Sequence, residues 1–106
     1  MKIKDGVVMQ GLQLPMRRVL MAADRIWSDL GQELVVTSAL DGEHSAGSMH
    51  YFGYALDFRT RYFTDKEVSI AYSLLCDALP DGYLVVREAT HIHVQYVEFE
   101  EIYGNG

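Results

Sequence analysis

Apolar residues recur every three or four positions in the stretch that begins at Pro15. Proline suits the first turn of a helix because its missing N–H would be unpaired there anyway, and Gly31 is suited to ending one. The pattern therefore predicts a helix over residues 15–30 with a single buried stripe. This stripe consists of Met16, Val19, Leu20, Ala23, Ile26, Trp27 and Leu30.

A second helix is predicted to begin after Thr64 and to end before Pro80. Thr64 and Glu67 have the spacing of a capping box, in which each side chain bonds the other residue's backbone N–H. The apolar stripe of this helix consists of Val68, Ala71, Tyr72, Leu75 and Leu79.

Segments 33–38, 53–60, 83–87 and 91–97 are rich in β-branched and aromatic residues, which favours strands. A further brief strand is expected at 7–10, and 39–52 is predicted to be a long loop, which in a small domain is usually functional or disordered. Along 53–60 the alternation of strand side chains separates two faces. Tyr54, Leu56 and Phe58 share one face, and Ala55, Asp57 and Arg59 share the other.

The order of these elements predicts an α+β domain, with two helices packed on a mainly antiparallel sheet of about four strands. The chain has 106 residues, so residues 1–106 are expected to form one domain with its core at about 15–97. Hydrophobic residues make up 49% and charged residues 23%, which is ordinary for a globular protein. We expect a monomer.

The formal net charge of −6 argues against nucleic acid and against an anionic membrane surface as partners. The first residues lack the apolar core of a signal peptide, and no apolar run is long enough for a membrane span. We therefore expect a soluble protein made in the cytoplasm, which would need release to act elsewhere.

The four histidines occur in two places: His44 and His50 in or beside the long loop, and His91 and His93 at the start of the last strand. Catalytic zinc takes three protein ligands and leaves a fourth position for water. Two histidines spaced two apart on a strand project from one face, so they could supply one ligand and one helper. An isolated His-x-His is more often a surface pair, but this one accompanies two further histidines and Asp57.

Two segments carry a resemblance to a known family. Residues 48–57 (SMHYFGYALD) resemble the Ser-x-His-x-x-Gly-x-Ala-x-Asp motif of zinc D-alanyl-D-alanine carboxypeptidases and dipeptidases, and residues 88–93 (EATHIH) resemble the second motif of that family. The wider group includes phage endolysin peptidases and the hedgehog signalling domain. The resemblance runs from about residue 15 to residue 96 and is closest to small phage-encoded members.

The resemblance implies one Zn2+ per chain, held by His50, Asp57 and His93. It implies that Glu88 is the general base and that His91 lies beside the bound water or the transition state. Some members carry only Glu-x-x-His, a spacing that would make His91 the third ligand in place of His93. Glu88 can join the site only if the chain turns just after it, because residues at odd spacings face opposite sides of a regular strand. We expect such a turn.

The resemblance also implies that Ser48 hydrogen-bonds substrate. Many members have a substrate-binding arginine after a Thr-Ser pair, but none follows Thr37 and Ser38 here. His44 or Arg59 is expected to take its place.

The function expected from the resemblance is that of a zinc metallopeptidase acting on peptidoglycan stem peptides, either as a D,D-carboxypeptidase or as an endopeptidase of the endolysin kind. The alternative is a catalytically silent zinc-containing binding module of the hedgehog type. A purely structural zinc site is less favoured, because such sites are usually closed by four Cys or His ligands.

Overall fold

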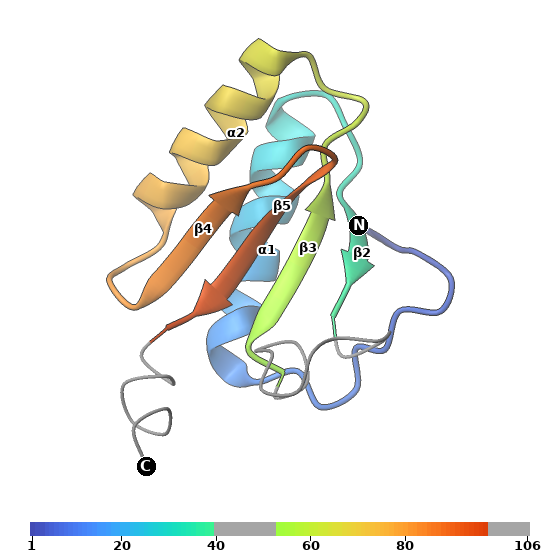
Figure 1. The fold of residues 1–106 in the computed structure, drawn as a ribbon, viewed down its shortest axis with the longest axis vertical. Coiled ribbons are helices and arrows are strands. Elements are labelled where there is room, and N and C mark those ends of the chain that lie inside the picture. Colours follow the sequence, from blue (N-terminus) through green and yellow to red (C-terminus); the bar gives the residue numbers. More distant parts are fainter. Residues whose placement is uncertain (40–52, 98–106) are drawn as a thin grey trace.

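The computed structural model describes residues 1–39 and 53–97. Within them the chain forms an α+β fold with two helices and one sheet (Figure 1). The elements in chain order are β1 (Lys2–Ile3), α1 (Leu14–Asp29), β2 (Val35–Ser38), β3 (Ala55–Arg59), α2 (Asp65–Ala78), β4 (Tyr83–Arg87) and β5 (His91–Tyr96).

The sheet is mixed, with the strand order β1-β2-β3-β5-β4. β1 runs parallel to β2, and the other neighbours are antiparallel. The expectation of about four strands is therefore corrected to five, and the expected strand at 7–10 is wrong. The additional strand is β1, which is held by backbone hydrogen bonds from Lys2 N to Leu34 O (2.7 Å) and from Lys4 N to Val36 O (3.0 Å).

Both predicted helices are present. α1 ends at a cap followed by Gly31, whose φ of 83° is the left-handed conformation that glycine tolerates best. α2 begins with the predicted capping box: Glu67 N donates to Thr64 Oγ1 (3.2 Å), and Thr64 N donates to Glu67 Oε1 (2.9 Å). Across the two described ranges, neither helix has the length and apolar character that crossing a membrane requires.

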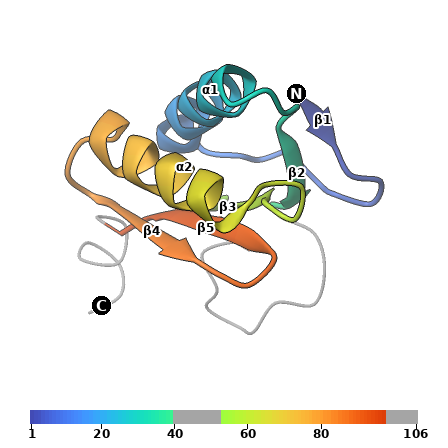
Figure 2. The same cartoon turned by 90° about the horizontal axis from the view of Figure 1, so that it is seen from above.

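Both helices cover the same face of the sheet (Figure 2). Trp27 of α1 is fully buried there, where its ring packs against Phe58 and Phe63 and its Nε1 donates to Arg59 O at 3.0 Å. Ile92 and Val94 of β5 are buried against the helices in the same way. The core therefore lies on one side of the sheet, and the other side presents the alternate residues of β3 and β5.

Candidate functional site

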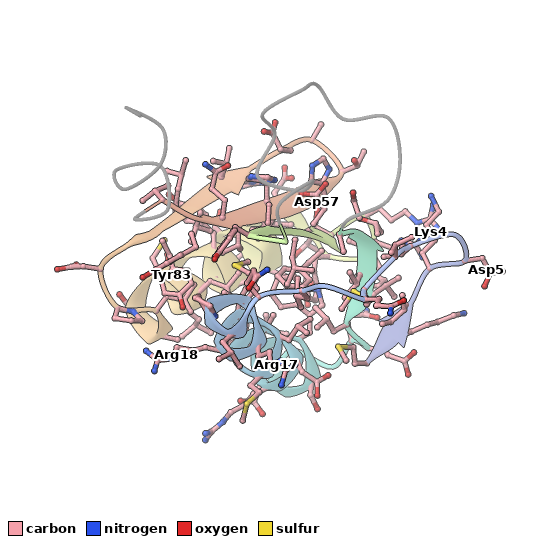
Figure 3. The ribbon with its side chains drawn as sticks, turned by 90° about the horizontal axis from the view of Figure 1, so that it is seen from below. Lys4, Asp5, Arg17, Arg18, Asp57 and Tyr83 are labelled. Atoms are coloured by element: carbon pink, nitrogen blue, oxygen red, sulfur yellow. The ribbon has the colours of Figure 1, made fainter. Side chains whose placement is uncertain are left out.

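Asp57 and His93 are opposite each other on adjacent antiparallel strands. The register between β3 and β5 pairs Asp57 with His93 and Arg59 with His91. Side chains alternate along a strand, and the intervening residues Phe58 and Ile92 are buried in the core under the helices. The four paired residues therefore face away from the helices. Figure 3 shows Asp57 on the side of the sheet away from α1.

The Asp57 carboxylate lies between the two histidine rings. Its Oδ1 is 2.8 Å from His93 Nδ1, and its Oδ2 is 3.8 Å from His91 Nε2. The exposed fractions of the side chains are 14% for Asp57, 19% for His93 and 30% for His91. All three side chains are thus partly shielded from solvent, and none is fully buried.

The remaining ring nitrogen of each histidine also has a polar partner. His93 Nε2 lies 2.7 Å from Gln95 Oε1, and His91 Nδ1 lies 3.1 Å from Thr90 Oγ1. Both nitrogens of His93 therefore face oxygen acceptors, so this arrangement suits the doubly protonated ring.

The pKa of His93 is raised above the usual histidine value, although its burial acts to lower it. Burial disfavours the charged ring, but hydrogen bonds to Asp57 and to Gln95 favour it. The negative charges of Asp57 and Glu88 act in the same direction. The surroundings of His93 therefore favour its protonated ring.

Glu88 lies in the tight connection between β4 and β5. Its N–H donates to His91 O at 2.9 Å, which closes the hairpin. The preceding residue, Arg87, reaches Ser69 and Asp65 of α2 on the helix side. By alternation Glu88 then belongs to the histidine side. The chain therefore turns just after Glu88, as expected, and the Glu88 side chain is exposed there.

A β-bulge borders the site on the β2 side. Val36 pairs with Phe58, but the next pair is Ser38 with Asp57, so Thr37 is an extra residue in β2. Thr37 Oγ1 donates to the backbone O of Asp57 at 3.4 Å. Bulges bend a strand and are frequent beside functional sites, where they redirect a side chain.

The structure brings together one part of the predicted site and leaves the rest undescribed. Asp57, His91 and His93 form one cluster, Arg59 lies on the same face opposite His91, and Glu88 lies at its hairpin end. The predicted ligand His50 and the predicted substrate contacts Ser48 and His44 lie outside the described residues.

The cluster contains imidazole nitrogens and carboxylate oxygens, which are the kinds of donor atom that zinc binds. Nitrogen and oxygen ligands lie about 2.0–2.2 Å from zinc, so two of them at tetrahedral positions are about 3.3–3.6 Å apart. The distances of 2.8 Å and 3.8 Å from Asp57 to the two rings fall on either side of that separation. Within residues 1–39 and 53–97 no three His, Cys, Asp or Glu side chains are grouped so as to hold a metal. A three-ligand site would need His50.

No protein-family model matches the chain, and no curated protein matches it. The two motif-like segments and the geometry of the Asp57 cluster are therefore the observations from which a function can be inferred.

Gln95 and Thr90 are polar partners of the cluster that the sequence patterns did not single out. The sequence did contain a pattern that points to Gln95. His91, His93 and Gln95 are spaced two apart along β5, so their side chains share one face of the sheet. Thr90 carries no such signal, because its hydroxyl meets His91 only through the shape of the hairpin.

Proposed function

We propose that this chain is a zinc metallopeptidase that hydrolyses peptide bonds in the stem peptides of peptidoglycan, as a D,D-carboxypeptidase or as an endopeptidase of the endolysin kind. We also propose that its α+β fold is of the hedgehog/D,D-peptidase type. The observation that carries the proposal is the Asp57 carboxylate within 2.8 Å of His93 and 3.8 Å of His91, on the sheet face without helices.

In this proposal His50, Asp57 and His93 hold one zinc ion. Zinc in such a site lowers the pKa of bound water to about 7 and polarises a carbonyl group. His93 Nδ1 lies closer to the Asp57 carboxylate than His91 Nε2 does, at 2.8 Å against 3.8 Å. This difference supports the choice of His93 as the third ligand. The runner-up is His91, whose Nε2 faces the other carboxylate oxygen.

Glu88 is proposed to take a proton from the attacking water and to pass it to the leaving amine. Its place at the hairpin, beside His91 and on the histidine side of the sheet, supports this role. A positioned carboxylate base contributes about 10²–10⁴-fold to a rate. His91, if it is not a ligand, is placed to donate a hydrogen bond to the developing oxyanion.

Substrate binding is assigned to Ser48, His44 and Arg59. Arg59 lies opposite His91 on the open face, one alternate position from Asp57 along β3. Its guanidinium can pair with a carboxylate of the stem peptide, which would replace the arginine absent after Ser38.

The metal assignment is tested by measuring zinc in the purified wild type and in His50→Ala, Asp57→Ala, His91→Ala and His93→Ala. We expect wild type to bind one zinc ion, His91→Ala to retain it and the other three to lose it. Loss in His91→Ala with retention in His93→Ala would exchange the roles of the two histidines. His44→Ala is the matched control, because it removes a histidine without removing a proposed ligand. A wild-type protein that takes up no zinc when supplied with it would overturn the proposal.

The reaction is tested by mass analysis of muropeptides after digestion with zinc-loaded protein. Wild type should release products, and Glu88→Gln should slow their release by about 10²–10⁴-fold while retaining zinc. Glu33→Gln, at an exposed glutamate before β2, is the control for loss of a negative charge. Zinc-loaded wild type that binds stem peptides without cleaving them would favour the silent binding module.

A further inference from the structure

Gln95 makes a short contact with the ring of His93 on the open face of the sheet. Its Oε1 lies 2.7 Å from His93 Nε2, and Nδ1 of the same ring faces Asp57 at 2.8 Å. The Gln95 amide and the Asp57 carboxylate therefore lie at the two different nitrogens of one imidazole ring.

We propose that Gln95 is a positioning residue that makes His93 present Nδ1, and not Nε2, to the metal. This inference rests on the proposed zinc site. It adds to that site a residue that would not contact the metal itself and that acts through the ring of a ligand.

The reason lies in the two nitrogens of the imidazole ring. A ring that binds a metal through one nitrogen carries its proton on the other, and the hydrogen bond made by that proton fixes the tautomer and the ring orientation. Here the Gln95 carbonyl accepts at Nε2. Zinc bound at Nδ1 would leave this hydrogen bond between Nε2 and Gln95 intact.

The other histidine supplies an internal comparison. His91 turns Nε2 toward Asp57, and its Nδ1 lies 3.1 Å from Thr90 Oγ1 in the exposed hairpin. Thr90 would thus position His91 as Gln95 positions His93. If His93 is the ligand, loss of the Gln95 carbonyl weakens zinc binding and loss of the Thr90 hydroxyl does not.

The test measures zinc affinity by competition with a chromogenic chelator in wild type, Gln95→Leu, Gln95→Glu and Thr90→Val. Gln95→Leu keeps similar bulk without an acceptor and should weaken zinc binding about 10–100-fold, as loss of a hydrogen bond to a ligating histidine typically does. Gln95→Glu retains an acceptor and should bind zinc at least as tightly as wild type. Thr90→Val should leave the affinity unchanged.

A second readout needs no variant. Two-bond proton–nitrogen correlation spectra of zinc-loaded wild type should show the His93 proton on Nε2 and the metal on Nδ1. A metal-bound Nε2, or equal zinc affinities of wild type and Gln95→Leu, would overturn the role of Gln95 while leaving the zinc site intact. Wild type that takes up no zinc would overturn the proposed function and this inference together.

Discussion

Strand β5 presents two kinds of side chain on its two faces. Ile92 and Val94 have no exposed surface beneath the helices, whereas His91 and His93 retain 30% and 19% of their side-chain exposure on the other face. Both helices cover one side of the sheet only (Figure 2). Consecutive residues of β5 therefore have different roles. The apolar residues are buried in the core, and the histidines on the other face are available for binding or catalysis.

The polar face stays compatible with folding because its most shielded charge, the Asp57 carboxylate, has a partner. A partly buried carboxylate is costly unless a partner compensates it, and Asp57 has His93 at 2.8 Å. None of the residues in the Asp57 cluster belongs to the hydrophobic core, in which Phe58, Ile92 and Val94 are buried. Substitutions on the two faces should therefore separate stability from metal binding.

The largest effect should come from Ile92→Ala, which opens a cavity in the core. Replacing a buried isoleucine by alanine costs about 2–5 kcal/mol. His91→Ala, at the adjacent position on the open face, should cost about 0.5 kcal/mol, as substitutions away from the core usually do. Urea unfolding of the chelator-treated proteins measures both changes. Equal losses in the two variants would contradict the division between the faces.

Most elements of this fold were predictable because their signals are local. The stripe that includes Trp27, the Thr64 capping box and the alternation that places Asp57 away from Phe58 each lie within a few residues of sequence. Each is confirmed, since a helix period, a cap or a strand alternation depends little on distant partners.

The misses concern features that depend on partners far along the chain. The two residues of β1 are too few to show a period. They form a strand because Lys2 N and Lys4 N donate to the carbonyls of Leu34 and Val36, more than 30 residues along the chain. The alternation along β5 places Gln95 on the histidine side, but its contact with His93 Nε2 depends on side-chain conformations, which sequence spacing does not encode. The predictions for His44, Ser48 and His50 concern residues outside the described ranges and stay predictions.

A smaller loss of stability is expected from Gly53→Ala, at the entrance to β3. Gly53 has φ of +77°, and a Cβ there would lie 2.5 Å from the backbone O of Gly11. The left-handed conformation alone costs a non-glycine residue about 1–2 kcal/mol, and the contact adds to it. The Gly53 carbonyl also accepts from Gln13 N at 3.0 Å, which ties β3 to the segment before α1.

Gly31→Ala provides the matched control in the same unfolding experiment. Gly31 has φ of +83° but nothing within 4 Å of a Cβ, so this variant carries the conformational cost without the collision. Gly53→Ala should therefore be the less stable of the two. Equal stabilities would show that the segment around Gly11 moves aside freely.

The smallest effect should be a pH dependence of stability that arises from His93 on the open face. The pKa of His93 is raised in the folded chain, where burial is outweighed by Asp57, Gln95 and Glu88. Because the folded pKa lies above the unfolded value of about 6.5, the stabilisation is fully present below that value. It is lost as pH rises through the folded pKa. Solvent screening at a partly exposed pair keeps the effect modest.

Asp57→Asn removes the charge that favours protonated His93, so comparing it with wild type isolates this contribution. In chelator-treated protein, the stability advantage of wild type should be larger at about pH 6 than at about pH 8.5, on either side of the histidine range. Ile92→Ala should instead lose a similar amount at both values, because a cavity does not titrate. A wild-type advantage that is the same at both pH values would mean that the Asp57 and His93 pair contributes no proton-linked stability, and the contrast between the two faces would then rest on burial alone.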